Sequence, residues 1–210
     1  MDLGPVSERI RSRLDAKSKA REAGLTNSRA AIRFCANSIR ATHRGDTELA
    51  DDLMRQARQA LDIAQSAMEP FPGVYHAGFL HDAEKEYAEA VATAALIRGT
   101  DLPSPEDLRV GDAAYLNGLA EAIGELRRHT LDIMRRGHLE RGEELLDAMD
   151  DIYYVLVSMD YPDALTGGLR RTTDVARSIM ERTRGDLSLT LIQKNLQDAI
   201  ADHTKRLDRP

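Results

Sequence analysis

Four breaks in the helical pattern of this chain share a short segment that begins with Arg-Gly, and these breaks constrain the fold more than any other feature. The copies are Arg44-Gly45-Asp46, Arg98-Gly99-Thr100, Arg136-Gly137-His138 and Arg184-Gly185-Asp186. A cation in the last helical turn favours the helix dipole, Gly supplies the left-handed residue that ends a helix, and Asp or Thr caps the next helix. Each copy therefore predicts a tight turn between two helices.

Helix-forming residues dominate between these turns, and no stretch alternates polar and apolar residues between hairpin signals. Pro70 and Pro72 mark a further junction, and Pro162 marks another. The pattern predicts an all-α fold, a seven-helix antiparallel bundle. We expect helices at 7–43, where Gly24 could introduce a kink, and at 47–69, 73–98, 110–136, 138–159, 163–184 and 187–206, with a loop at 100–109.

Length and composition exclude several other classes. A chain of 210 residues with 42% hydrophobic and 30% charged residues suits one globular domain. We expect a single domain over 1–210, in which 1–24 is the start of the first helix and 25–206 is the core bundle. No apolar run has the length of a membrane span or a signal peptide, so we expect a cytoplasmic protein with no membrane partner. The single cysteine, Cys35, excludes an internal disulfide and a thiolate zinc site.

One face of the predicted first helix carries arginines without acids. The residues recur at spacings of three and four, which places them within roughly 40° of the centre of one helix face; they are Arg29, Arg33, Asn37, Arg40 and Arg44. A solvated face normally mixes both signs of charge. Although the net charge is −6, the first 44 residues hold ten Lys or Arg against four Asp or Glu. The stripe predicts a face that binds nucleic-acid phosphates, with His43 near its end, and an ordinary solvated face is the alternative.

Acidic residues on two predicted helices form a candidate metal site. They are Glu86, Glu89, Glu121 and Glu125. Glu89 lies in a segment, 88–97, that is apolar nearly all round and should be buried. Glu121 lies opposite an apolar stripe, on a face where Gly118 permits another helix to approach. Because Mg²⁺ prefers carboxylate oxygens, the four residues predict a Mg²⁺ site that Mn²⁺ could also fill. A plain surface face is the alternative for Glu121 and Glu125.

Periodicity leaves more than one chemical class for such a site. A di-iron bundle requires Glu-x-x-His on two helices, and neither acidic pair has it. An all-α nucleoside triphosphate pyrophosphohydrolase also uses paired acids and stays open. Nucleic-acid hydrolysis is the class that also accounts for the arginine stripe, and a non-catalytic nucleic-acid-binding shell is a further alternative.

Two motifs resemble a known family. Lys85-Glu86-Tyr87-Ala88-Glu89-Ala90 resembles the Gln-Glu-Tyr-x-Glu-Ala motif of the translin family. The segment from Tyr115 to Leu126, YLNGLAEAIGEL, is similar to the family's Tyr-Leu-x-Gly-Val segment in the version of translin-associated factor X. Ile39-Arg40-Ala41-Thr42-His43-Arg44 fits as well, and the resemblance extends over about 25–200.

This resemblance implies a specific activity. Subunits of that family have seven helices and form a hollow octamer that encloses short RNA, and the X-type subunit is a Mg²⁺-dependent endoribonuclease. The resemblance implies a homo-octamer that acts on short single- or double-stranded RNA, with DNA as a second possible ligand. Carried over, the catalytic and metal-binding acids are Glu86, Glu89, Glu121 and Glu125, where Glu121 stands in place of the family's Asp. The backbone of RNA would then bind Arg29, Arg33, Arg40, His43 and Arg44.

Overall fold

The computed structural model describes residues 2–207, and over that range it is all-α without a strand. Its long helices are α1 (Gly4–Arg44), α2 (Thr47–Met68), α4 (Gly78–Arg98), α6 (Asp112–Met134), α7 (Leu139–Ser158) and α9 (Leu169–Leu207). Three helices of one turn lie between them, α3 (Pro72–Tyr75), α5 (Pro105–Leu108) and α8 (Asp163–Thr166). The predicted all-α bundle is confirmed. None of the helices in 2–207 is both long and apolar enough to cross a membrane.

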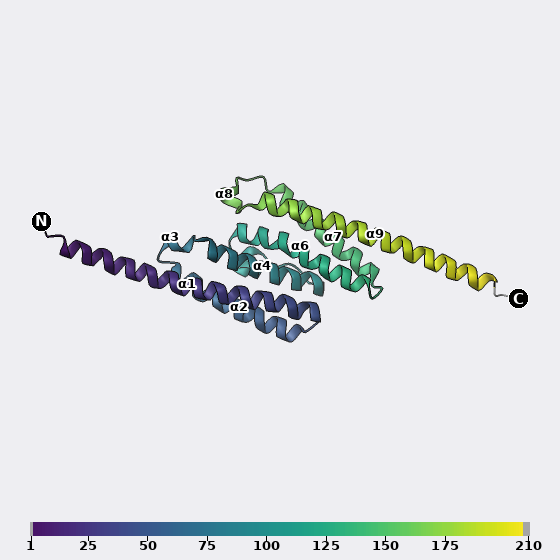
Figure 1. Cartoon of the computed structure of the whole chain (residues 1–210), viewed down its shortest axis with the longest axis horizontal. Coiled ribbons are helices and arrows are strands. Elements are labelled where there is room, and N and C mark those ends of the chain that lie inside the picture. The colour runs from purple at the N-terminus through teal and green to yellow at the C-terminus, as the bar shows by residue number, and fades with distance from the viewer. Residues whose placement is uncertain (1, 208–210) are drawn as a thin grey trace.

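The long helices run nearly parallel to one axis and form three packed pairs (Figure 1). α1 pairs with α2, α4 pairs with α6, and α7 pairs with α9; the α4/α6 pair lies in the middle, with α1 against α4 and both α7 and α9 against α6. The N-terminal part of α1 and the C-terminal part of α9 project past this body in opposite directions. The centre of the molecule is therefore the α4/α6 interface.

Three of the four predicted Arg-Gly helix stops are present. Gly45, Gly99 and Gly137 have φ values of 76°, 71° and 86°, the left-handed conformation that glycine adopts without strain. After the first stop, the Asp46 side chain accepts a hydrogen bond from the backbone N–H of Leu49 and caps α2. These boundaries follow from local chemistry alone, which is why the sequence predicted them.

The fourth predicted stop, at Gly185, is wrong. α9 runs through it without interruption, so the two helices expected at 163–184 and 187–206 are instead the short α8 and one helix of 39 residues. Met180, Thr183 and Leu187 are buried on one face that continues across Gly185. Burial of that face favours an unbroken helix by more than the roughly 1 kcal/mol that an internal glycine costs.

Smaller differences concern the helix starts and the loop. The helix expected at 73–98 is divided into α3 and α4, and the predicted loop at 100–109 contains α5, whose Ser104 and Asp107 form a reciprocal capping box. α1 continues through Gly24 without a break. A Cβ at Gly24 would lie 2.2 Å from Sδ of Met68, so glycine here permits close packing of α1 against the end of α2.

Two apolar clusters flank the central pair. One joins α1, α2 and α4 around Leu61 and Leu80, and the other joins α6, α7 and α9 around Ile123, Leu126 and Met149. Cores on both sides hold α4 and α6 at a fixed separation. Polar groups carried on the facing surfaces of this pair are therefore brought together in the interior of the bundle.

Candidate active site

Gly118 sets how closely α6 approaches α4. A Cβ at this position would lie 2.7 Å from the Ala88 Cβ and from the Lys85 carbonyl oxygen, and 2.9 Å from the Glu89 backbone nitrogen. No side chain fits there, so the two backbones are in direct contact. Glu121, almost one turn further along α6, is thereby placed opposite the acidic pair of α4.

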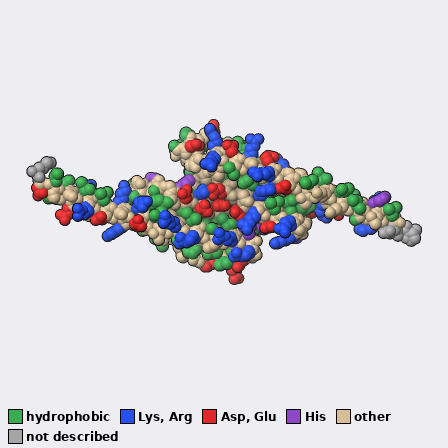
Figure 2. Space-filling view, in the orientation of Figure 1, with side chains coloured by type: hydrophobic (Ala, Val, Ile, Leu, Met, Phe, Trp, Pro, Cys, Tyr) green, Lys and Arg blue, Asp and Glu red, His purple; other side chains and the backbone are tan. Residues whose placement is uncertain are grey.

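Three of the four predicted acids meet at this contact. Glu86, Glu89 and Glu121 each offer a carboxylate oxygen, and these oxygens all lie within 4.8 Å of one another. We call these residues the acidic trio; each is half-buried. Figure 2 shows acidic side chains gathered at the centre of the visible face, over α4 and α6, with Lys and Arg on either side. The side chains of Glu86 and Glu121 are 28% and 34% exposed, so the trio is partly accessible to solvent.

Simultaneous ionisation of all three carboxyl groups of the trio is unfavourable. Burial raises the pKa of Glu89 to about 8, and the charges of Glu86, Glu121 and Glu125 act in the same direction. Burial also raises the pKa of Glu86, with a further contribution from Glu121, while Lys85 opposes the shift. In the absence of a cation, Glu89 thus holds a proton near neutral pH.

Lys85 lies within the same cluster. Its Nζ is 2.7 Å from Oε1 of Glu121 and 3.7 Å from Oε1 of Glu86. Burial by itself lowers the pKa of Lys85, but the hydrogen bond to Glu121 and the surrounding acidic charges outweigh burial, so its pKa lies above the usual value. Lys85 is therefore a charged ammonium group among the carboxylates.

The fourth acid, Glu125, has a different partner. Its Oε2 is 2.5 Å from Nε2 of His43 on α1, and Arg128 is 3.7 Å away. The hydrogen bond from His43 lowers the pKa of Glu125, against the effect of burial. Glu125 is thus ionised where Glu89 is not, and it is not part of the acidic trio.

His43 is placed differently from the arginines of its helix. Its side chain is 4% exposed, and Nδ1 is buried without a hydrogen-bond partner in 2–207. The ring of His129 lies 6.1 Å away, and burial, followed by the charge of His43, lowers the pKa of His129. His43 therefore faces the acids of α6 in this structure, and its predicted contact with RNA stays a prediction.

The predicted arginine stripe forms an exposed face of α1. Arg29, Arg33, Arg40 and Arg44 are all exposed. Arg40 donates a hydrogen bond to Asn37, and within the described chain none of the four arginines has a carboxylate partner at ion-pair distance. The opposite side of α1 packs against α4, the helix that carries Glu86 and Glu89: burial, followed by the charges of these two acids, raises the pKa of Cys35. Four unneutralised guanidinium groups thus lie on a helix that borders the trio.

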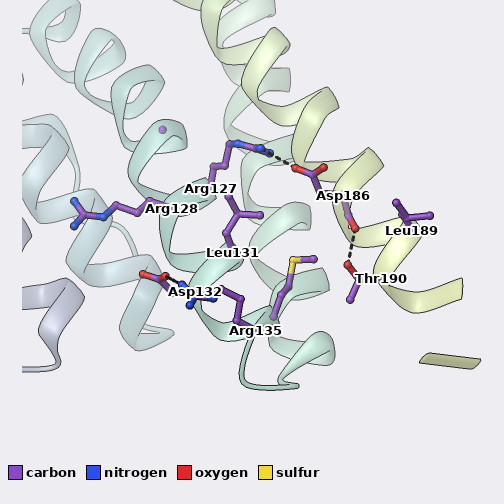
Figure 3. Close-up of a pocket in the computed structure, with 10 residues that line it drawn as sticks. Arg127, Arg128, Leu131, Asp132, Arg135, Asp186, Leu189 and Thr190 are labelled. Carbon is purple, nitrogen blue, oxygen red and sulfur yellow. Dashed lines mark hydrogen bonds and ion pairs between the residues drawn. The ribbon is translucent and has the colours of Figure 1, made fainter. Parts of the chain in front are cut away.

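A separate groove runs between α6 and α9. It has a volume of about 770 Å³ and is lined in part by Leu131, Arg135 and Leu189. Figure 3 shows Arg127 reaching across it to Asp186, at 2.7 Å, while Arg128 points away from α9. No residue of the acidic trio lines this groove. The candidate site is accordingly the trio, which is a cluster of facing side chains between α4 and α6.

Comparison with known proteins places this arrangement in a family. No family model matches the chain. Uncharacterized protein MJ0175 of Methanocaldococcus jannaschii is 33% identical over 194 residues, which are 91% of this chain and 83% of that protein. The structure of AfC3PO in complex with duplex RNA superposes with a TM-score of 0.82 at 35% identity, over 89% of this chain and 96% of that one. C3PO is a translin-type complex. The chain belongs to the translin family.

Two further structures support that assignment to different degrees. A crystal structure of AfC3PO matches with a TM-score of 0.82 at 34% identity, over 89% of this chain and 97% of that one. Apo-NeC3PO matches with a TM-score of 0.81 at 18% identity, over 90% and 100% of the two chains, which shows a shared fold only. The translin fold therefore accounts for nearly all of the chain.

Set against the translin motifs, the site has two features of its own. Glu121 stands where the family motif has Asp, and its longer side chain still reaches the two acids of α4. Lys85 stands where the motif has Gln, and sequence reasoning gave it no role although it contacts two carboxylates. The sequence signal for this role was the position of Lys85 directly before the acid pair Glu86 and Glu89. The pairing of His43 with Glu125 had no such signal, because 82 residues separate the two positions.

Proposed function

We propose that this chain is a Mg²⁺-dependent endoribonuclease that binds RNA inside a hollow homo-oligomer of eight copies. The observation that carries the proposal is the convergence of Glu86, Glu89 and Glu121 within 4.8 Å, next to a helix with an exposed arginine face. Identity of 35% to AfC3PO, which has been captured with duplex RNA, supports RNA as the ligand. Membership of the translin family supports nuclease chemistry.

The donor set of the trio suits a hard divalent cation. All three residues offer carboxylate oxygen, the ligand type that Mg²⁺ and Mn²⁺ take, and no thiol or imidazole belongs to the trio. Burial, followed by the charges of the neighbouring acids, raises the pKa of Glu89, and a bound cation would favour its ionised form. Glu86, Glu89 and Glu121 would hold the cation. When bound, Mg²⁺ polarises a phosphoryl oxygen and lowers the pKa of a water molecule.

The remaining residues supply binding and orientation. Arg29, Arg33, Arg40 and Arg44 neutralise RNA phosphates and hold the RNA backbone. His43 fixes Oε2 of Glu125, so that Oε1 of this ionised carboxylate accepts a hydrogen bond from the attacking water. The water passes a proton to Glu125 and attacks phosphorus opposite the leaving oxygen; the P–O bond to that oxygen breaks, and the leaving oxygen takes a proton from solvent.

A cleavage assay on short labelled RNA tests the nuclease. We expect single- or double-stranded RNA to be cut with Mg²⁺ and left intact with EDTA. Glu89→Gln should abolish cleavage and retain RNA binding, while Glu140→Gln, an exposed change on α7, should cut like the natural chain. Cleavage by Glu89→Gln at the unmodified rate would remove the trio from the mechanism. A parallel reaction with a nucleoside triphosphate tests the pyrophosphohydrolase alternative, and RNA that binds uncut in every condition identifies a non-catalytic shell.

Apolar stripes on the projecting ends of α1 and α9 support assembly. The exposed residues are Leu3 at the N-cap of α1, Val6, Ile10 and Leu14 on α1, and Leu189, Ile192, Leu196 and Ile200 on α9, at helical spacings of three and four. An isolated helix with an apolar stripe in water is marginal, and such stripes are typical of subunit contacts. We propose that other copies of the chain cover them. Light scattering should show Ile192→Asp as a smaller species than Gln193→Asp, which adds the same charge one residue along; equal masses would exclude the α9 stripe from the interface.

A further inference from the structure

The acidic trio already contains a positive charge of the chain's own. Lys85 lies on α4 directly before Glu86, and its side chain extends toward α6. Its Nζ lies 2.7 Å from Oε1 of Glu121 and 3.7 Å from Oε1 of Glu86, so it touches an acid on each helix. This bridging position between two members of the trio is one that a bound cation would also use.

The contact differs from an ordinary surface ion pair. The Lys85 side chain is 20% exposed and that of Glu121 is 34% exposed, whereas the pair formed by Lys194 and Asp198 on α9 is more than half exposed on both sides. The close approach of the two helices at Gly118 involves the Lys85 backbone itself, so the root of this side chain is fixed against α6. Solvent screens such a pair less than a surface pair.

A dication bound by the trio would repel the ammonium group of Lys85. Both would contact Glu121, and like charges that share one carboxylate at short range are strongly unfavourable. Because the side chain of lysine is long and its ammonium group has no fixed orientation, the ammonium group can leave while the backbone stays in place. Binding of a dication then requires that the hydrogen bond between Lys85 and Glu121 be broken.

We propose that Lys85 is the resident counter-ion of the acidic trio, and that a divalent cation binds only by displacing its ammonium group from Glu121. The proposal rests on the proposed function, because it takes the trio as the metal site. Lys85 stabilises the metal-free protein by neutralising part of the trio, and it weakens metal binding by the same interaction. The affinity of the site for divalent cations is thus set by a competition inside the chain.

Three variants separate this role from a merely structural one. Lys85→Met keeps an unbranched side chain and removes the charge, and Lys85→Arg keeps the charge. Lys194→Met removes a lysine charge from α9, far from the trio in sequence and on another helix. Circular dichroism and a melting curve in EDTA confirm that each full-length variant is folded before metal is added.

Mn²⁺ titration followed by electron paramagnetic resonance, which detects the unbound ion, tests the proposal without RNA. We expect Lys85→Met to bind Mn²⁺ at least about tenfold more tightly than the natural chain, because removing a like charge at short range strengthens cation binding. Lys85→Arg and Lys194→Met should stay within about twofold of the natural chain by the same reasoning. We also expect Lys85→Met to melt at a lower temperature in EDTA and to gain more from Mn²⁺ than the natural chain gains. Equal or weaker Mn²⁺ binding by Lys85→Met would overturn the proposal.

The same experiments distinguish an error in the proposed nuclease activity from an error in the proposed role of Lys85. If Lys85→Met binds Mn²⁺ more tightly and RNA is not cut by any form, the counter-ion role stands and the proposed reaction is wrong. If Glu89→Gln binds Mn²⁺ as well as the natural chain does, the trio is not the metal site and both proposals are overturned.

Discussion

Replacing Glu89 by Gln should make the metal-free protein more stable at alkaline pH and change its stability little near pH 5. The reason is the pKa of the Glu89 carboxyl, which burial and the neighbouring acids raise from an ordinary value of 4.5 to about 8. In the unfolded chain this group loses its proton near the ordinary value. Between these two pKa values the folded state holds a proton that the unfolded state has released, so the stability of the natural chain falls as pH rises through this window.

The size of the effect follows from the same shift. One pKa unit corresponds to about 1.4 kcal/mol, which gives a ceiling of about 5 kcal/mol above pH 8. Because Glu89 is half-buried and solvent screens part of the repulsion, we expect about 2 kcal/mol. Gln has nearly the same shape as Glu and does not ionise, so Glu89→Gln escapes this penalty. The gain should grow from pH 4.5 to pH 8 and then level off.

Urea denaturation in EDTA at several pH values across this window measures the difference in the free energy of unfolding. Glu125→Gln is the matched control with the opposite sign, because the hydrogen bond from His43 lowers the pKa of Glu125. Ionised Glu125 stabilises the folded state above its ordinary pKa, so this control should lose stability at neutral pH, and the loss should vanish as pH falls through the lowered pKa. A difference between Glu89→Gln and the natural chain that does not change with pH would refute the reasoning.

Three other predictions address packing, RNA binding and the orientation of the fourth acid. Gly118→Ala should lower the free energy of unfolding, measured in urea, by about 2 kcal/mol or more, because the new Cβ would overlap α4. Gly124→Ala is the control: its Cβ would have its nearest neighbouring atom at 3.9 Å, so the change should be neutral or stabilising. Equal losses of stability in the two variants would contradict the close contact between the helices. Arg33→Glu should weaken RNA binding and reduce its dependence on salt concentration, as measured by fluorescence anisotropy. Arg55→Glu, an exposed change on α2, should leave both quantities unchanged. Similar effects of the two variants would show that RNA binding depends on the net charge of the chain and not on the arginine stripe. His43→Ala should raise the pKa of its carboxylate partner in a carbon-13 NMR titration, and an unchanged pKa would show that their hydrogen bond is weak in solution.

Local signals in the sequence account for most of the helix boundaries. Gly45, Gly99 and Gly137 end their helices as predicted, because a left-handed glycine and a capping residue act within a few positions of each other. Gly185 has the same neighbours and lies inside α9, because Met180 and Leu187 are buried against the bundle on both sides of it. Local chemistry is therefore sufficient only where tertiary packing does not favour a longer helix.

The sequence by itself determined which side chains share a helix face. Spacings of three and four residues placed Glu86 with Glu89 and aligned the exposed arginines of α1, because the period of an α-helix is fixed by its backbone hydrogen bonds. The close approach at Gly118 placed Glu121 against Lys85 and the acid pair of α4, and the packing of α1 placed His43 against Glu125. Only the tertiary structure decided these partners, because the separation and rotation of two helices depend on side chains from the whole core and not on the period of either helix.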